Sequence, residues 1–316
     1  MTKIKAAVIG VGYLGRFHAQ KYAQLPDCEL TAVVDGREDV CRAVAAEVGT
    51  RAVSDYRQLL GEVDAVSVVT PTPMHFDIAR EFLVAGAHVL VEKPITETPS
   101  QARELIETAA RAQRLLQVGH LERFNAAVLA AEPHLHAPRF IECHRLAPYK
   151  ERGTDVNVVL DLMIHDIDLV QSLAGSDIVS IDAIGSPVFS GEIDIANARI
   201  RFANGCVANT TASRVSLKTE RKLRIFEDAA YISLDLQQKI LTLIRKKQGG
   251  PQPGELPVSI EEASLEQGDA LKAEISSFLD CIRNNKRPLV SGEDGLRALE
   301  TAIRITEQVH ANMAAR

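Results

Sequence analysis

Residues 4–15 read IKAAVIGVGYLG, and this stretch decides the fold class of the chain. The residues before the first glycine are mostly apolar and predict a buried strand. The strand runs into the pattern G-x-G-x-x-G, formed by Gly10, Gly12 and Gly15, and a helical pattern follows over residues 14–24. A strand, this glycine pattern and a helix in that order are typical of a dinucleotide-binding turn.

The next strand signal, at residues 30–34, ends in Asp35, about 20 residues beyond the last glycine of the pattern. In a dinucleotide-binding unit, an acid at this spacing accepts the hydroxyl protons of the adenosine ribose. The helix that begins at Tyr13 and Leu14 offers unpaired N–H groups and positive dipole charge to a pyrophosphate. The glycine turn, these two residues and Asp35 are therefore predicted to bind a nicotinamide dinucleotide.

The choice between NAD and NADP depends on two side chains. Asp35 would repel a 2′-phosphate, which favours NAD. Arg37, two residues later, would attract such a phosphate, so NADP stays open as the less favoured cofactor.

Strand and helix signals alternate over residues 1–120, which predicts a Rossmann domain with a parallel sheet covered on both faces. Further helices are expected at residues 38–48, 55–60, 74–85 and 99–113, and further strands at residues 64–70, 88–91 and 115–118. Because ligands bind beyond the carboxyl ends of parallel strands, residues after these strands should line the cofactor crevice. The predicted contacts of this kind are Thr70, Pro71, His75, Glu92 and Lys93. His75 has a second interpretation as a helix cap.

The alternation of strand and helix signals ends near residue 121, and the pattern that follows predicts a second domain of the α+β type over residues 121–316. Helices are expected at residues 122–131, 156–173, 266–283 and 295–312, and β-like runs at residues 139–145, 178–185, 193–202, 206–214, 220–227, 231–234 and 239–244. The alternation in these runs favours a mostly antiparallel, open-faced sheet, with one face on helices and the other toward solvent or another subunit. A Gly/Pro-rich loop is expected at residues 248–257, and the C-terminal helix is able to pack back on the first domain.

Composition excludes several classes of protein. A net charge of −6 argues against a general nucleic-acid binder, and no apolar run reaches the length of a membrane span. The five cysteines are scattered and odd in number, which favours reduced thiols, and the nine histidines show no metal-ligand spacing. The first strand follows Met1 at once, so we expect no signal peptide and a cytoplasmic location.

Lys93 lies in the segment Glu92-Lys93-Pro94, at the end of a predicted strand beside the cofactor crevice. A lysine there can donate to a substrate oxygen and stabilise negative charge that develops on it. A surface lysine before a turn proline is an equally good interpretation of the position alone.

Asp161 and His165 are four residues apart on a predicted helix, so they share a face, and Asp168 lies near it. A histidine exchanges protons near neutral pH, and a carboxylate beside it can orient the ring. Burying this pair in an otherwise apolar helix costs free energy unless the groups find partners. The pair is either catalytic or a satisfied core pair.

A basic cluster follows near the junction of the two domains, and it would suit the phosphates of a substrate. Its members are His120, Arg123, His144, Arg145, Lys150 and Arg152. Ordinary solvated charges explain each of them singly.

The order of these motifs resembles the Gfo/Idh/MocA oxidoreductases. The resemblance covers essentially the whole chain and includes a late pattern of Glu274, Phe278, Pro288, Gly292 and Gly295. It implies a Rossmann domain, a substrate domain with an open-faced sheet, and assembly of dimers or tetramers through that sheet. It also implies that Lys93 and His165 act at the reacting alcohol carbon, that Asp161 contacts substrate or His165, and that the bond before Pro94 is cis.

Within the family, residues 118–125, 139–169 and 204–214 resemble the UDP-N-acetylglucosamine 3-dehydrogenases of lipid A precursor synthesis. That resemblance implies oxidation of a sugar C3 hydroxyl to a ketone, which an aminotransferase then converts to an amine. Lys93, His120, Arg123, Arg145, Lys150, Asp161 and His165 would contact the sugar nucleotide. Lys93 and His165 remain interchangeable as the base. Oxidation of another sugar or an inositol, and a sensor without catalysis, are the alternatives.

Overall fold

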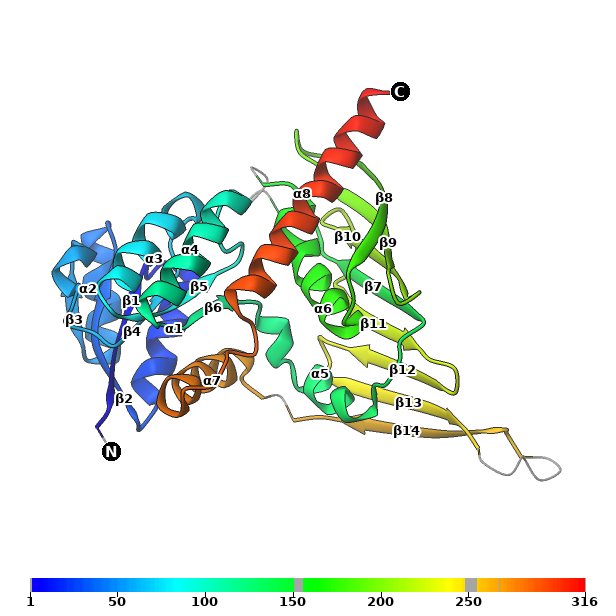
Figure 1. Ribbon diagram of the computed structural model, residues 1–316, viewed down its shortest axis with the longest axis horizontal. Helices are drawn as coiled ribbons and strands as arrows, with labels where there is room; N and C mark the ends of the chain where they lie inside the picture. The colour runs from blue at the N-terminus through cyan, green and yellow to red at the C-terminus, as the bar shows by residue number, and fades with distance from the viewer. Residues whose placement is uncertain (1, 151–155, 248–254, 267, 316) are drawn as a thin grey trace. The chain divides into compact units, whose positions relative to one another are not determined.

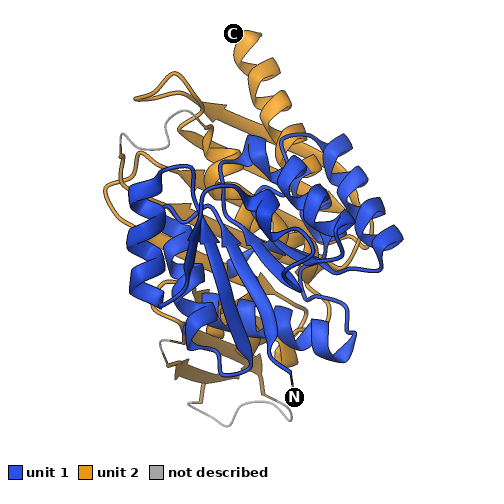
Figure 2. Cartoon of the chain, turned by 90° about the vertical axis from the view of Figure 1, so that its left-hand side faces the viewer, with its two compact units in different colours: residues 1–121, 269–299 blue, residues 122–268, 300–316 orange. Residues whose placement is uncertain are grey.

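The computed structural model describes four ranges of the chain, which are residues 2–150, 156–247, 255–266 and 268–315. The chain groups into two compact units (Figure 2). Unit 1 comprises residues 1–121 and 269–299, and unit 2 comprises residues 122–268 and 300–316.

The second unit is therefore not the continuous stretch 121–316 that we expected from the sequence. Residues 269–299 group with unit 1 instead. The reason is burial, because Ile275, Phe278 and Leu279 of this segment join the hydrophobic core that β1, β2 and α1 build in unit 1.

The centre of unit 1 is a six-stranded, wholly parallel sheet with the order β3-β2-β1-β4-β5-β6 (Figure 1). Its strands are β1 (Ile4–Ile9), β2 (Cys28–Val34), β3 (Arg51–Val53), β4 (Ala65–Val68), β5 (His88–Glu92) and β6 (Leu116–Gly119). All four residues of β4 are buried, as expected for a strand covered on both faces. The sequence did not predict β3, because three residues are too few to show a period.

Helices flank this sheet, and Figure 2 shows them on either side of the strands of unit 1. They are α1 (Tyr13–Gln24), α2 (Glu38–Val48), α3 (His75–Val84), α4 (Pro99–Ala112) and α7 (Ala270–Asn284), with 3-10 turns at Tyr56–Leu59 and Thr72–Met74. The bounds of the first four helices agree with the predicted ones to within one residue. Helix α7 packs on α1, which is how a segment far along the chain completes the first core.

Unit 2 is built on an eight-stranded sheet with the order β14-β13-β12-β11-β7-β10-β9-β8. Its strands are β7 (Phe140–Leu146), β8 (Ile178–Ser186), β9 (Ile195–Phe202), β10 (Val207–Ser213), β11 (Glu220–Phe226), β12 (Ala230–Asp235), β13 (Ile240–Lys246) and β14 (Val258–Ser264). The β7–β10 pair is parallel and the other pairs are antiparallel. Strand β14 was not predicted, since five of its seven residues are exposed and it lacks an apolar face. Most of the predicted Gly/Pro-rich loop, residues 248–254, lies outside the described ranges.

The helices of unit 2 are short at its beginning and longer at its end. They are a 3-10 turn at Leu121–Phe124, α5 (Ala126–Ala131), a 3-10 turn at Glu132–His134, a π-helix at Val159–Met163, α6 (Ile164–Ala174) and the later part of α8 (Gly292–Ala314). The strong helix predicted over residues 156–173 thus begins as a π-helix. Alternating burial along β9 leaves one face of the sheet covered and the other partly open, as predicted.

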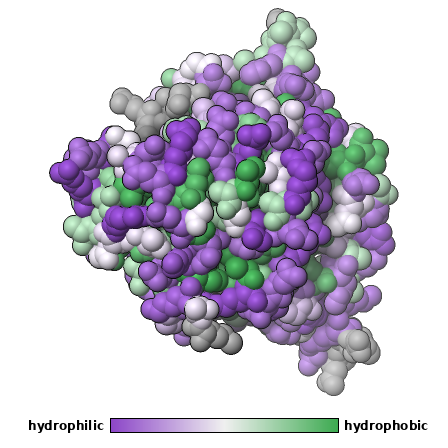
Figure 3. Space-filling view, turned by 60° about the vertical axis from the view of Figure 1, so that its left-hand side comes forward, coloured by the Kyte–Doolittle hydropathy of each residue, from purple (hydrophilic) through white to green (hydrophobic). Residues whose placement is uncertain are grey.

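None of the helices in the described ranges is long and apolar enough to cross a membrane. Figure 3 shows a face of the molecule that is mostly hydrophilic, with apolar side chains in smaller groups between the polar ones.

Candidate active site

The turn after β1 is shaped to leave its backbone open. Gly10 has φ +88, and a Cβ there would lie 2.7 Å from the Val69 carbonyl oxygen. A Cβ on Gly15 would overlap the Gly10 carbonyl oxygen, so the helix can approach the strand only without a side chain. At Gly12 the nearest atom to an added Cβ is Arg37 Nη2 at 3.5 Å.

Helix α1 begins at this turn without a side-chain cap or an acid in its first turn. Its first N–H groups and dipole are therefore available to an anion. Tyr13 and Leu14 are exposed at the same point, at 71% and 39%. A dinucleotide pyrophosphate fits this place, because the glycine turn leaves its backbone exposed and the N-terminus of α1 is uncapped.

Asp35 follows β2 and connects this turn to Arg37. Its carboxylate accepts hydrogen bonds from the Val11 N–H at 3.1 Å and the Arg37 N–H at 3.0 Å. Arg37 Nε lies 3.4 Å from the same carboxylate. The structure thus brings together the two side chains between which the choice of NAD or NADP was left open.

The loops after β4 and β5 are joined by His75. Its ring nitrogens lie 2.8 Å from the Thr70 carbonyl oxygen and 2.9 Å from the Pro94 carbonyl oxygen. The helix-cap interpretation of His75 is wrong, since α3 has no side-chain cap. The Lys93–Pro94 bond is cis, as the resemblance implied. Pro71 is exposed, and Thr70 and Lys93 are half-buried.

A buried acid cluster lies behind Lys93. Glu92 accepts hydrogen bonds from the His18 ring at 3.1 Å and from the Lys93 N–H at 3.2 Å. A Cβ on Gly119 would lie 2.8 Å from the Glu92 carboxyl carbon, so β6 leaves no room beside it. Burial raises the pKa of Glu92, but His18 and Lys93 outweigh burial and hold it below its usual value.

Glu274 of α7 is the second carboxyl group of this cluster. Its side chain is fully buried, and Gln117 Nε2 donates to its backbone carbonyl at 3.5 Å. Burial, with the charge of Glu92, raises the pKa of Glu274 well above its usual value. Sequence reasoning assigned no role to His18 or to the Glu274 carboxyl. The available signal was a titratable residue on the apolar face of each predicted helix.

Asp161 and His165 come from two consecutive elements of unit 2. Asp161 lies in the π-helix, and His165 lies in the first turn of α6. Both are half-buried, whereas their neighbours Asp166 and Asp168 are buried. Single π-helical turns are frequent at functional sites, and this one lies where the paired residues remain accessible.

Arg145 of β7 has a structural role that differs from the predicted phosphate contact. Its guanidinium makes two hydrogen bonds to the Asp166 carboxylate, at 2.8 and 3.0 Å, and one to Glu122 at 2.9 Å. Its exposed fraction of 3% leaves almost no surface for a phosphate. Burial lowers the pKa of Arg145, but Asp166 and Glu122 outweigh burial and raise it. This network fixes α6, which carries His165, to β7.

The remaining members of the basic cluster have different surroundings. Arg123 is buried and pairs with Asp168 at 3.5 Å, while His120 is buried at the end of β6 in unit 1. Lys150 is exposed, and His144 pairs with Glu220 at 3.6 Å. Arg152 lies outside the described ranges.

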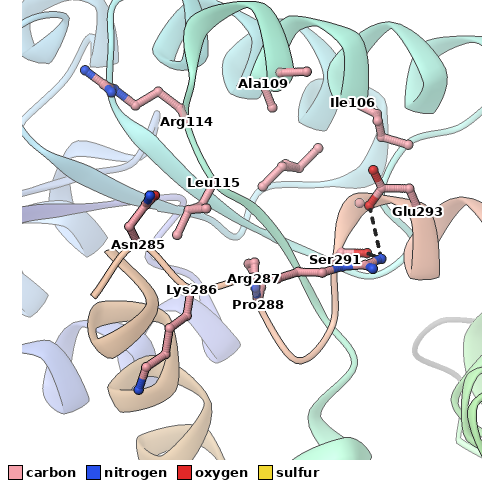
Figure 4. Close-up of a pocket in the computed structure, with 13 residues that line it drawn as sticks. Ile106, Ala109, Arg114, Leu115, Asn285, Lys286, Arg287, Pro288, Ser291 and Glu293 are labelled. Atoms are coloured by element: carbon pink, nitrogen blue, oxygen red, sulfur yellow. Dashed lines mark hydrogen bonds and ion pairs between the residues drawn. The ribbon is translucent and has the colours of Figure 1, made fainter. Parts of the chain in front are cut away.

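A cavity of about 310 Å³ lies at the other end of the sheet of unit 1. Arg114 and Leu115 line it just before β6 begins, so it lies at the amino end of that strand (Figure 4). Arg287 reaches Ser291 and Glu293 across its rim. Its lining contains none of the predicted site residues.

In the described ranges, no group of three His, Cys, Asp or Glu side chains is placed to bind a metal ion. The five cysteines are free and buried.

The open glycine turn, the acid after β2 and the lysine after β5 all lie at the carboxyl edge of one parallel sheet, which defines a dinucleotide-binding protein of the oxidoreductase class. The chain belongs to the Gfo/Idh/MocA oxidoreductase family. The family model of the NAD-binding Rossmann fold matches residues 4–120, and the model of the C-terminal alpha/beta domain matches residues 145–314. These matches confirm the predicted family and the two-part fold.

Known relatives match over the full length of the chain. The UDP-N-acetylglucosamine 3-dehydrogenase of Acidithiobacillus ferrooxidans is 40% identical over 98% of this chain and 99% of its own. A solved structure of UDP-N-acetylglucosamine 3-dehydrogenase GnnA from that organism covers the same shares, with a TM-score of 0.93. The scyllo-inositol 2-dehydrogenase (NAD(+)) of Bacillus subtilis is 26% identical over 98% of this chain and 95% of its own.

Proposed function

We propose that this oxidoreductase oxidises the C3 hydroxyl of a UDP-N-acetylhexosamine, UDP-N-acetylglucosamine in the first place, with NAD⁺. The observation that carries this proposal is the 40% identity to a UDP-N-acetylglucosamine 3-dehydrogenase over 98% of the chain. The TM-score of 0.93 to such an enzyme supports it, because the similarity extends through the substrate domain and not only the cofactor domain.

The site residues of the chain suit this reaction. Bound NAD⁺ supplies the hydride acceptor for the alcohol carbon. The glycine turn and Asp35 would hold its pyrophosphate and ribose, and the Thr70 and Lys93 loops would flank the nicotinamide. His165, oriented by Asp161, takes the hydroxyl proton, and Lys93 stabilises the negative charge that develops on the oxygen. Lys93 and His165 can exchange these two roles.

Activity can be tested directly with purified protein. UDP-N-acetylglucosamine and NAD⁺ should give the absorbance of NADH, and more of it when a hydrazine traps the ketone. Controls with myo-inositol and with UDP-N-acetylgalactosamine distinguish the sugar, because the inositol relatives act on a ring without a nucleotide. Turnover of inositol without turnover of either sugar nucleotide would show that the substrate is an inositol and not a sugar nucleotide. Binding of NADH without turnover of any of the three would favour a sensor.

Asp35 is expected to select NAD over NADP. A carboxylate beside a 2′-phosphate repels it, so we expect NADPH to bind about tenfold more weakly than NADH. Fluorescence titration of NADH and NADPH measures the ratio. The isosteric Asp35→Asn variant removes the charge and should bring the two dissociation constants closer together. Tighter binding of NADPH by the unaltered protein, lost in Arg37→Ala, would assign the selection to Arg37 instead.

The partners of the protein follow from the same proposal. A homodimer or homotetramer would cover the open face of the eight-stranded sheet, and size-exclusion chromatography with light scattering measures it. We also place the enzyme in the cytoplasm, where an aminotransferase would consume the ketone.

A further inference from the structure

His75 contacts two active-site loops at once. Its Nε2 lies 2.8 Å from the Thr70 carbonyl oxygen, two residues after β4 ends, and its Nδ1 lies 2.9 Å from the Pro94 carbonyl oxygen, two residues after β5 ends. The side chain is 1% exposed, so water does not compete for either nitrogen. The ring therefore bridges the loop proposed to flank the nicotinamide and the loop that contains Lys93.

Both partners of the ring are acceptors, and this restricts its protonation state. A neutral imidazole has one N–H, and its other nitrogen presents a lone pair. A lone pair that faces a carbonyl oxygen at 2.8 or 2.9 Å is repelled, whereas an N–H at that distance makes a good hydrogen bond. The two contacts are both favourable only when both nitrogens carry a proton.

The surroundings of the ring have opposing effects on the pKa of His75. Burial lowers the pKa of His75 below its usual value, because it outweighs the opposing effects of the two carbonyl groups and of the charge of Glu92 on β5. Glu92 is held as a carboxylate by His18 and by the charge of Lys93. The hydrogen-bond geometry opposes this effect of burial, because a carbonyl acceptor at each ring nitrogen and an anion on the neighbouring strand both favour the imidazolium.

We propose that His75 is a positioning residue, which donates from both ring nitrogens as an imidazolium and holds the Lys93–Pro94 loop against the Thr70 loop. This role rests on the proposed function, since it matters for turnover only if Lys93 acts on substrate. We call the two hydrogen bonds of the His75 ring, to the Thr70 and Pro94 carbonyl groups, the tie. The tie keeps the Lys93 side chain at a constant place relative to the nicotinamide. Displacement of a catalytic group by about 1 Å can cost on the order of 10²-fold in rate.

The protonation state can be measured without substrate or cofactor. In protein labelled with ¹⁵N-histidine, the long-range ¹H–¹⁵N spectrum at neutral pH should show both ring nitrogens of His75 as protonated. The His75→Gln spectrum identifies the signals by difference. A ring with one lone-pair nitrogen would overturn the proposal, and this outcome does not depend on what the enzyme oxidises.

Two conservative variants separate the two ends of the tie. The amide of His75→Gln can take the place of Nε2 and keep the Thr70 bond, while that of His75→Asn can take the place of Nδ1 and keep the Pro94 bond. We expect His75→Gln to lower kcat about tenfold with an NADH dissociation constant near that of the unaltered protein. His75→Leu, which keeps neither bond, should lose more of kcat than either.

Circular dichroism before each assay shows whether a variant is folded. If none is, nuclear Overhauser contacts of the ring protons with Thr70 and Pro94 identify the His75 signals in the unaltered protein, and its spectrum decides the proposal. Folded His75→Gln and His75→Leu with unchanged kcat would show that the tie does not position Lys93, and would overturn the proposal. If the unaltered protein oxidises no sugar nucleotide, the proposed function fails. The imidazolium signals still decide whether the tie exists.

Discussion

Replacing Lys93 or His165 by alanine is expected to lower kcat by about 10²- to 10⁴-fold, with little change in the dissociation constant for NADH. The reason is that neither residue belongs to the turn that binds pyrophosphate and ribose. Each is proposed to act on the alcohol, as proton acceptor or as stabiliser of the oxyanion. Steady-state kinetics with UDP-N-acetylglucosamine and fluorescence titration of NADH measure the two quantities.

Matched controls exist elsewhere in the chain. Lys286, which pairs with Asp280 at 3.0 Å, and His136 are both exposed and lie outside the proposed site. Lys286→Ala and His136→Ala should keep the kcat of the unaltered enzyme. The variant of Lys93 or His165 that also loses the acidic limb of the kcat/KM profile against pH identifies the base. If both variants lose NADH binding while turnover per bound cofactor is unchanged, the assigned roles are contradicted.

Replacing Arg145 by alanine is expected to destabilise the protein by about 3–5 kcal/mol, the range measured when one partner of a buried ion pair is removed. The substitution leaves the carboxylates of Asp166 and Glu122 buried without their guanidinium. The midpoint of urea unfolding, followed by circular dichroism, should fall. Because Asp166 lies next to His165 on α6, kcat should fall as well.

The control for this prediction is a pair with the same chemistry and a different environment. Arg139 makes two hydrogen bonds to Asp228 on the surface, with side chains that are 60% and 77% exposed. Arg139→Ala should leave the unfolding midpoint essentially unchanged, since solvent replaces the lost partner. Arg145→Lys should recover only part of the stability, because an ammonium cannot reproduce the paired bonds to Asp166. Equal midpoints for Arg145→Ala and Arg139→Ala would show that the buried network contributes nothing to stability.

The cofactor half of the site could be predicted because its signals are local in the chain. Gly10, Gly12 and Gly15 act through backbone shape, and Asp35 acts through its position at the end of the next strand. Each of these roles depends on neighbours within one βαβ unit. Periodicity located the helices around them to within one residue for the same reason.

The roles of Arg145 and His75 could not be predicted, because they depend on groups that meet only after folding. Arg145 was predicted to contact the substrate or to be an ordinary solvated charge in a basic cluster. It pairs with Asp166, 21 residues away, and the pair fixes α6 to β7. His75 was expected to cap its own helix or to touch the cofactor. Neither interpretation included the contact with a carbonyl group 19 residues away, after another strand.

The amino-acid sequence by itself determined the family, the glycine turn, the acid after β2 and the order of most strands and helices, since these follow from short-range pattern and backbone sterics. Tertiary structure decided which titratable side chains are buried and which groups each of them contacts. Residues 269–299 return to the first core and bring Glu274 toward Glu92. Gln117 donates to the Glu274 carbonyl group although the two residues are 157 positions apart in the chain. Protonation and ion pairing depend on desolvation and on distances across the fold. The spacing of residues along the chain predicts neither desolvation nor these distances.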